Sequence, residues 1–110
     1  MAILDKGGSP VQISVTGRHI EFTESMRQYA EEKLTKLTRF YDRIGKIDVV
    51  LDQEPTKHRL EVVMHGDHKT TFVAQVEAGE YHEAVDLIVE KLERQLNKHK
   101  EKHRNRKHQS

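Results

Sequence analysis

The spacing of the apolar residues along this chain switches between the period of a β-strand and that of an α-helix. A period of two indicates a strand with one buried face, and steps of three and four indicate a helix. Alternation predicts four strands, around Val11, Ile13 and Val15; Ile47, Val49 and Leu51; Leu60, Val62 and Met64; and Phe72, Ala74 and Val76. Helical spacing occurs twice, at Met26, Ala30, Leu34, Leu37 and Tyr41, and at Tyr81, Val85, Ile88, Val89, Leu92 and Leu96. The predicted order is therefore β-α-β-β-β-α.

The first predicted helix starts after Thr23, which is suited to cap it, and Gly45 marks its stop. The second starts near Glu80 and has no clear stop. Polar residues alternate with the apolar ones in the strands, so one face of the sheet is expected to contact water. The sequence predicts an α+β fold, a single domain with a four-stranded sheet and two helices packed on one face. Its first two strands are expected to be parallel, because a helix connects them.

Alternation also predicts how the last three strands pair, because directly paired residues share a face of the sheet. Pairing Leu51 with Leu60 leaves a four-residue loop, Glu54-Pro55-Thr56-Lys57. Pairing Leu60 with Ala74 leaves a three-residue loop, Gly66-Asp67-His68.

The 110 residues are enough for one hydrophobic core. Because Gly7-Gly8-Ser9-Pro10 interrupts any regular element, we expect a flexible leader at residues 1–10, a folded domain at 11–102 and a basic C-terminal tail at 103–110. The chain has no cysteine and no run of about 20 apolar residues. Neither disulfides nor a membrane span is predicted, and a cytoplasmic location is expected.

Positive charge is concentrated at the C-terminal end, although the net charge is only +1. Residues 98–110 contain six Lys or Arg and one Glu, whereas the preceding residues contain more acids than bases. Clustered cations raise the local potential whatever the net charge, so the pattern indicates a polyanionic partner approached from one side. A tail that only increases solubility is the alternative.

Both predicted helices also separate their charges around the helix axis, at about 100° per residue. On the second helix the basic flank consists of Lys91, Arg94, Lys98 and Lys102, and the acidic flank of Asp86, Glu90, Glu93 and Glu101. The first helix sets Lys36, Arg39 and Arg43 against Glu24, Glu31 and Asp42, although Glu32 lies on its basic side. This segregation favours contact with a nucleic-acid backbone. The alternative is a pair of ordinary solvated faces with supporting ion pairs, such as Glu90 with Arg94.

Aromatic residues are scarce among these cations. We expect the following aromatic residues to lie in the core or at its rim and not to stack on bases: Tyr29, Phe40, Tyr41, Phe72 and Tyr81. This interpretation favours structured RNA that is recognised by its shape over single strands bound by stacking.

The sequence contains no recognisable pattern of residues for metal binding or catalysis. The histidine pairs His65 with His68 and His99 with His103 have no evident third ligand, so no metal site is predicted. No glycine-rich phosphate loop or other catalytic motif is present. We therefore predict no cofactor and a protein that is not an enzyme.

Several short blocks carry a resemblance to a known family by their order and spacing. They are Ile13-Ser14-Val15-Thr16-Gly17, Glu21-Phe22-Thr23-Glu24, Lys36-Leu37, Asp42-Arg43-Ile44 and, as the strongest, Lys91-Leu92-Glu93-Arg94-Gln95-Leu96-Asn97-Lys98-His99-Lys100. From Val11 to about Lys102 the chain resembles the ribosome hibernation promoting factors and ribosome-associated translation inhibitors. The β-α-β-β-β-α order is also that of this family.

The resemblance implies a bacterial ribosome-binding domain at residues 11–102, with the small ribosomal subunit and its rRNA as partners. It implies occlusion of the decoding channel, which mRNA and tRNA otherwise occupy, in stationary phase or stress. The basic helix positions of the family correspond here to Lys36, Arg39, Arg43, Lys91, Arg94 and Lys98, with Arg18 and Lys33 as further positions, and the basic flank adds Lys102.

The chain is similar to the short class of this family, because it ends at Ser110 with no second domain. Short members differ in whether they promote or prevent ribosome dimers, and the basic tail resembles the dimer-promoting kind. A separate ribosome-dimerising factor is a further candidate partner, and a monomer is expected off the ribosome. The leader of ten residues is longer than expected for the family.

Two other functions fit the sequence. Members of the family have been described as modulators of an alternative sigma factor, and Val50, Val63 and Val73 on the solvent-exposed face of the sheet offer a surface for a protein. The third candidate is a free double-stranded RNA-binding module.

Overall fold

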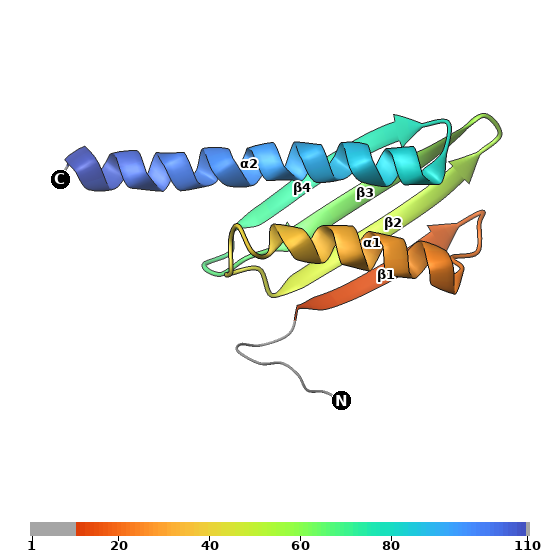
Figure 1. Cartoon of the computed structure of the whole chain (residues 1–110), viewed down its shortest axis with the longest axis horizontal. Helices are drawn as coiled ribbons and strands as arrows, with labels where there is room; N and C mark the ends of the chain where they lie inside the picture. The colour runs from red at the N-terminus through yellow and green to blue at the C-terminus, as the bar shows by residue number, and fades with distance from the viewer. Residues whose placement is uncertain (1–10, 110) are drawn as a thin grey trace.

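The computed structural model describes residues 11–109, with the side chains of residues 11–102, and contains six elements in the predicted order (Figure 1). These are β1 (Gln12–Arg18), α1 (Glu24–Leu37), β2 (Lys46–Glu54), β3 (Lys57–His65), β4 (Thr71–Ala78) and α2 (Tyr81–Gln109). The predicted leader, residues 1–10, lies outside the described residues, as do the side chains of the predicted tail, residues 103–110.

The sheet has the strand order β1-β2-β3-β4. Strand β1 is parallel to β2, and the other neighbours are antiparallel. Both helices lie side by side on the same face of the sheet, with α2 packed on β3 and β4 (Figure 1). The predicted α+β fold, the parallel first pair and the single helix-covered face are therefore confirmed.

The core forms where the predicted apolar stripes of the helices meet the dry face of the sheet. The strands contribute Ile47, Val49, Leu51, Leu60, Val62, Met64, Phe72 and Ala74. The helices contribute Ala30, Leu34, Leu37, Tyr81, Ala84, Val85, Ile88, Leu92 and Leu96. No polar or charged residue is buried within residues 11–102, so apolar packing holds the layers together.

The starts of both helices agree with the sequence. Thr23 caps α1, because its hydroxyl accepts a hydrogen bond from the backbone N–H of Met26 at 3.1 Å. Glu80 precedes α2, and its carboxylate accepts a hydrogen bond from the backbone N–H of Glu83 at 3.2 Å.

The predicted end of the first helix is wrong, because α1 stops at Leu37 and not near Gly45. The backbone N–H groups of Thr38, Arg39 and Phe40 each donate to the carbonyl three residues earlier, so the chain tightens into a turn. Tyr41 still reaches the core from this turn, since its ring packs edge-on against Phe72 with 5.7 Å between ring centroids. This packing explains why the helical spacing continues beyond the helix.

The first hairpin has the predicted pairing but a shorter loop. Leu51 pairs with Leu60, and the ladder continues to Glu54 and Lys57. Only Pro55 and Thr56 remain outside the ladder, instead of the four residues predicted.

The second hairpin is shifted by two residues from its predicted register. Leu60 pairs with Val76, not with Ala74, and the loop comprises residues 66–70 in place of the three predicted. Hydrogen bonds from Gly66 N to Thr70 O and from Thr70 N to Asp67 O close the loop. Within this loop, His68 and Lys69 adopt positive φ angles of 55° and 62°. Their residue types alone do not predict this backbone conformation.

The outer edge of β4 is covered by side chains from α2. Lys91 Nζ donates to the carbonyl oxygen of Gln75 at 3.0 Å, and Gln95 Nε2 donates to that of Val73 at 2.8 Å. These carbonyls would otherwise be free to pair with another strand. Helix α2 therefore protects one edge of the sheet as well as its dry face.

Candidate nucleic-acid interface

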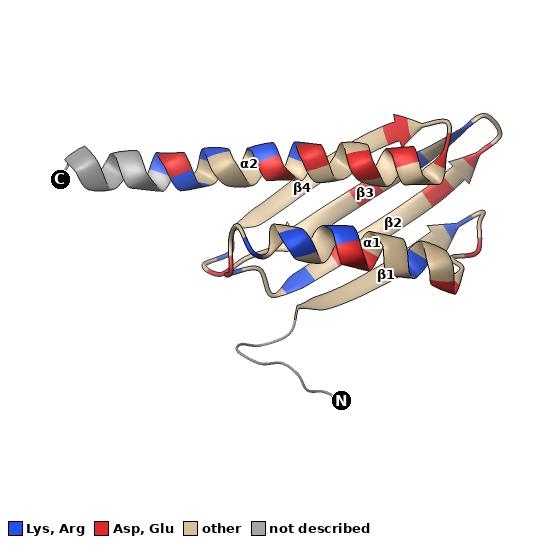
Figure 2. Cartoon of the chain, viewed as in Figure 1, with Lys and Arg blue, Asp and Glu red and all other residues tan. Residues whose placement is uncertain are grey.

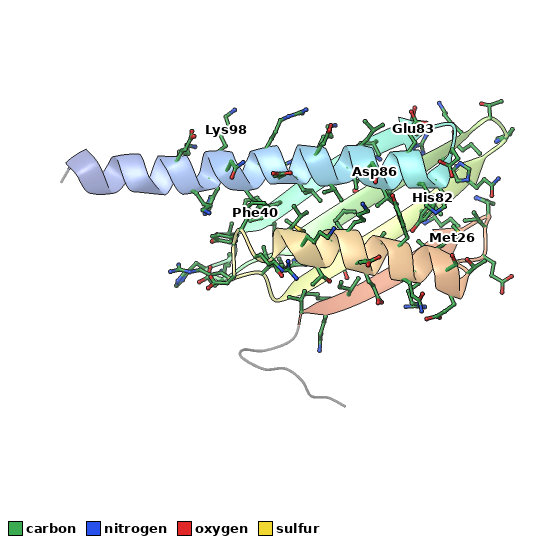
Figure 3. All side chains as sticks on the ribbon, in the orientation of Figure 1. Met26, Phe40, His82, Glu83, Asp86 and Lys98 are labelled. Carbon is green, nitrogen blue, oxygen red and sulfur yellow. The ribbon has the colours of Figure 1, made fainter. Side chains whose placement is uncertain are left out.

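Helix α2 presents its acidic flank to α1 and its basic flank away from it. The Tyr29 hydroxyl of α1 donates a hydrogen bond to Asp86 Oδ1 at 2.8 Å, and this bond is the main cause of the raised pKa of Tyr29. Lys91 lies on the other side of α2, against β4. Figure 3 shows the same division, with Asp86 and His82 toward α1 and Lys98 pointing away from it. The two flanks of α2 are thus separate surfaces.

Lys33, the first predicted contact residue of α1, lies on the side of that helix that faces α2. Lys33 Nζ lies 5.4 Å from the centre of the Tyr29 ring, and Lys33 is half-buried. Lys36 and Arg39, one and two turns further along, are exposed. Near the starts of the helices, the acidic flank of α2 therefore lies between the cations of α1 and those on the outer flank of α2.

Charge is also separated along the length of α2. Residues 81–93 contain four acids and one base, whereas residues 94–102 contain four bases and one acid. In Figure 2 the red segments of α2 lie mainly toward its start and the blue ones toward its described end. This order complements the helix dipole, which is positive at the N-terminus and negative at the C-terminus.

Cations at the end of α1, in the loop after it and on α2 lie toward the same end of the molecule (Figure 2). Tyr41 links the two regions, because its ring lies 5.3 Å from the His99 ring of α2, measured between centroids. Tyr41 stands between Arg39 and Arg43 in the chain, and His99 stands between Lys98 and Lys100. We call the following exposed residues the basic end: Lys36, Arg39, Arg43, Lys98, Lys100 and Lys102.

Most cations of the basic end have no acidic partner. Arg43 Nη1 lies 3.7 Å from Asp67 Oδ2, and the other five form no ion pair within residues 11–102. Burial raises the pKa of the Tyr41 hydroxyl beneath them, with a further contribution from Asp67. The hydroxyl therefore stays neutral near pH 7. Exposed, unpaired cations on a neutral support suit the binding of phosphates and offer no acid-base chemistry.

The other predicted contact residues lie in three different places. Lys91 and Arg94 continue along the outer flank of α2, where Arg94 Nη2 is 3.8 Å from Glu90 Oε1. Lys33 lies between the helices. Arg18 lies at the far end of the sheet, since it pairs with Asp52 near the end of β2, whereas Arg43 precedes the start of that strand. The predicted set is therefore brought together only in part.

Three cations at or beside the basic end were not among the predicted residues. The position of Lys100 around the helix axis lies outside the predicted basic flank, although Lys100 was counted among the basic residues of the C-terminal end. Lys46 starts β2, with Nζ 3.9 Å from Asp48 Oδ1. Lys69 lies in the β3–β4 loop, two residues after the Asp67 that contacts Arg43, and the wrong loop prediction concealed this placement.

Of the histidines considered as metal ligands, His65 and His68 each lie beside a carboxylate, whereas the His99 ring packs against Tyr41 and Phe72, and the side chain of His103 lies outside the described residues. His65 Nε2 is 3.0 Å from Asp48 Oδ2, and His68 Nε2 is 3.6 Å from Asp67 Oδ2. Among the described side chains no three His, Asp or Glu residues are grouped as a metal site would require. Within the same part of the chain, no helix combines the length and the apolar character needed to span a membrane.

Two proteins with a similar sequence carry the name ribosome hibernation promoting factor. The ribosome hibernation promoting factor of Azotobacter vinelandii is 37% identical over 92 residues, which cover 84% of this chain and 85% of that protein. The factor of the same name from Escherichia coli K12 is 35% identical over 92 residues, with 84% and 96% covered. None of these names describes a catalytic activity, in agreement with the prediction of a protein that is not an enzyme.

Solved structures give the same relationship. A ribosomal subunit interface protein from Coxiella burnetii superposes with a TM-score of 0.76 at 28% identity, covering 82% of this chain and 98% of that one. The N-terminal domain of Thermus thermophilus Protein Y superposes with a TM-score of 0.74 at 29% identity, covering 80% and 98%. The family model of the Sigma 54 modulation protein / S30EA ribosomal protein matches residues 13–104. The predicted family is therefore confirmed, and the chain belongs to the Sigma 54 modulation protein / S30EA ribosomal protein family.

Proposed function

We propose that this protein is a hibernation factor that binds the decoding channel of the small ribosomal subunit through rRNA phosphates. The observation that carries the proposal is the basic end, where exposed cations from the end of α1, from the loop after it and from α2 lie toward one end of the molecule, and five of the six have no acidic partner within residues 11–102. The names of the relatives support a ribosomal partner. The proposed setting is the bacterial cytoplasm during stationary phase or stress.

The proposed mechanism is occlusion. A small domain with a wholly apolar core is rigid enough to fill a channel, and it competes with mRNA and tRNA by occupying their place. The protein acts as a monomer off the ribosome. With a separate dimerising factor and its own basic tail, it favours inactive ribosome dimers.

Co-sedimentation with purified small subunits tests the binding surface. The double variant Arg94→Glu with Lys98→Glu reverses two exposed cations of α2 and leaves the hydrogen bond of Lys91 to β4 intact. We expect its affinity to fall by at least about tenfold, because two phosphate contacts become repulsive. The matched control, Glu90→Gln with Glu93→Gln, changes the other flank of the same turns. Equal losses in both variants would show that the ribosome senses the integrity of the helix and not its basic flank.

Titration of a purified translation reaction tests the mechanism. Occlusion requires about one protein per ribosome and full recovery of activity once high salt has stripped the protein. Inhibition far below one protein per ribosome, or activity that does not return, would contradict occlusion and indicate damage to the ribosome.

A second candidate function is protein binding at the solvent-exposed face of the sheet. Val73 is 51% exposed there and pairs with Val63, and the family description includes sigma-54 modulation. Sedimentation with small subunits, with purified sigma factor and with plain duplex RNA separates this candidate and the double-stranded RNA module from the main proposal. Preference for sigma factor or for plain duplex over the subunit would reject the main proposal.

A further inference from the structure

Phe40 is the exception among the aromatic residues. The chain has three Phe and three Tyr, and all six lie within the described residues. Phe22, Tyr29, Tyr41, Phe72 and Tyr81 each form at least one contact with another aromatic ring and pack in or against the core. Phe40 forms no such ring contact within residues 11–102, is not one of the buried core residues, and is 43% exposed. Core packing therefore does not explain its side chain.

The backbone that carries Phe40 is held in place. Its N–H donates to Leu37 O at 3.0 Å in the turn that ends α1, and Thr38 Oγ1 donates to Thr35 O at 2.6 Å in the same turn. The next residue, Tyr41, is fixed by its contacts with Phe72 and His99. The exposed ring is thus presented from a fixed backbone, which lowers the entropy cost of binding a ligand to it.

The surroundings of Phe40 are cationic. Arg39 precedes it, Lys36 lies one turn earlier and Arg43 lies three residues later, and all three are exposed. The contact between Tyr41 and His99 brings Lys98 and Lys100 of α2 toward the same region. Figure 3 shows Phe40 beyond the C-terminal end of α1, toward the end of the molecule where Lys98 lies on α2. An aromatic face among cations that track phosphates is the arrangement by which proteins bind unpaired nucleotides.

We propose that Phe40 stacks on an unpaired nucleobase of the RNA whose phosphates the basic end holds, an inference that rests on the proposed function. The proposal gives Phe40, which was expected in the core or at its rim, a role in binding. Single exposed apolar residues are common on proteins. The other large exposed ones, Leu87 and Val73, are aliphatic and have no π face. The site adds recognition of a base to contacts that otherwise recognise only charge and shape.

Two variants of the full chain test this proposal with purified small subunits. Phe40→Leu keeps an apolar side chain but removes the π face, and Phe40→Tyr, the matched control, keeps the ring. Thermal unfolding of both is compared with the wild type first, and unchanged midpoints are expected because Phe40 lies outside the core. We then measure affinity as a function of salt and map the rRNA bases that each protein protects from dimethyl sulfate.

The stacking role predicts that Phe40→Leu weakens subunit binding about 5- to 100-fold and Phe40→Tyr by less than about threefold. The salt slope should not change, because no charge is altered. One base protected by the wild type and by Phe40→Tyr should become reactive with Phe40→Leu at saturating protein. Wild-type affinity of Phe40→Leu, equal losses in both variants, or an unchanged set of protected bases would each overturn the proposal. The last result would indicate a contact with a ribosomal protein. If the wild type itself does not bind small subunits, the proposed function fails and this inference fails with it.

Discussion

Lys91 Nζ lies 3.0 Å from the backbone carbonyl oxygen of Gln75, so a cation on the basic flank of α2 is hydrogen-bonded to the outer edge of β4. The side-chain amide of Gln95 likewise donates a hydrogen bond to the backbone carbonyl oxygen of Val73 on this edge. Lys91→Met with Gln95→Met keeps the length of both side chains and removes both donors. We expect the free energy of unfolding, measured by urea denaturation, to fall by about 1 kcal/mol, the low end for two bonds because Lys91 is exposed.

The control for this loss is Lys98→Met, which removes an exposed cation from the same helix that makes no hydrogen bond within residues 11–102. Its effect should stay within about 0.5 kcal/mol. Equal stabilities of the control and the double variant would show that the edge contacts do not stabilise the fold. Sedimentation of the double variant at high concentration should also reveal self-association through the freed edge.

Asp48 makes part of the stability depend on acid pH. Hydrogen bonds from Ser14 Oγ, at 2.8 Å, and with His65 lower the pKa of Asp48 below its ordinary value. A lowered folded pKa means that this stabilisation is complete above about pH 4 and is lost as the pH falls through the folded pKa. We expect Asp48→Asn to unfold at a lower urea concentration than wild type at pH 6, and the difference to shrink toward pH 2.

The control for the pH effect is Asp42→Asn, which removes an exposed carboxylate that forms no hydrogen bond or ion pair within residues 11–102. Its stability curve between pH 6 and about pH 2 should run parallel to that of the wild type. The link between Asp48 and acid stability would be refuted by a constant difference between wild type and Asp48→Asn across this range.

Gly17 lies at a close approach of the backbone near the end of β1. A Cβ atom built there would lie 2.4 Å from the carbonyl oxygen of Ile20, so the backbone must shift to accept a side chain. We expect Gly17→Ala to lower the free energy of unfolding by about 1 to 3 kcal/mol. Gly45→Ala is the matched control, because nothing lies within 4 Å of its Cβ position, and it should be neutral or slightly stabilising. A Gly17→Ala protein as stable as Gly45→Ala would contradict the steric explanation.

Binding through phosphate contacts should weaken as the salt concentration rises. With about six to eight contacts, the slope of log affinity against log salt for small subunits should lie between about −4 and −7. Lys102→Met should make this slope shallower by about 0.7 to 0.9, the contribution of one phosphate contact. An affinity that does not change between about 50 and 200 mM salt would exclude phosphate binding as the main source of affinity.

Alternation in the sequence predicted the faces of the sheet but could not determine every register. Moving β4 by two residues against β3 leaves Phe72 and Ala74 on the same dry face, so the pattern is satisfied by both pairings. The choice is made by the loop at residues 66–70, where His68 and Lys69 adopt left-handed backbone angles. Neither residue type signals this conformation, whereas the pairing of Leu51 with Leu60 needed no such information.

The candidate site was predictable as a list of cations but not as a surface. Periodicity placed Lys98 and Lys102 on one flank of their helix and Arg39 and Arg43 near the end of the other, and all four are exposed at one end of the molecule. Periodicity within a helix carries no information on how two helices are oriented about each other. The bond between Tyr29 and Asp86, which turns the acidic flank of α2 toward α1, therefore could not be foreseen.

The change of sign along α2 gives the molecule an electric dipole moment that points along its long helix. In the field of a polyanion such a dipole experiences a torque before any contact forms, so the positive end turns toward the surface while the partner is still about a Debye length away, roughly 8 Å at physiological salt. A net charge of +1 would provide almost no long-range attraction by itself. The association rate should thus depend on how the charges are arranged, and a variant with the same charges in exchanged halves of α2 would turn the start of α2, instead of its end, toward the partner.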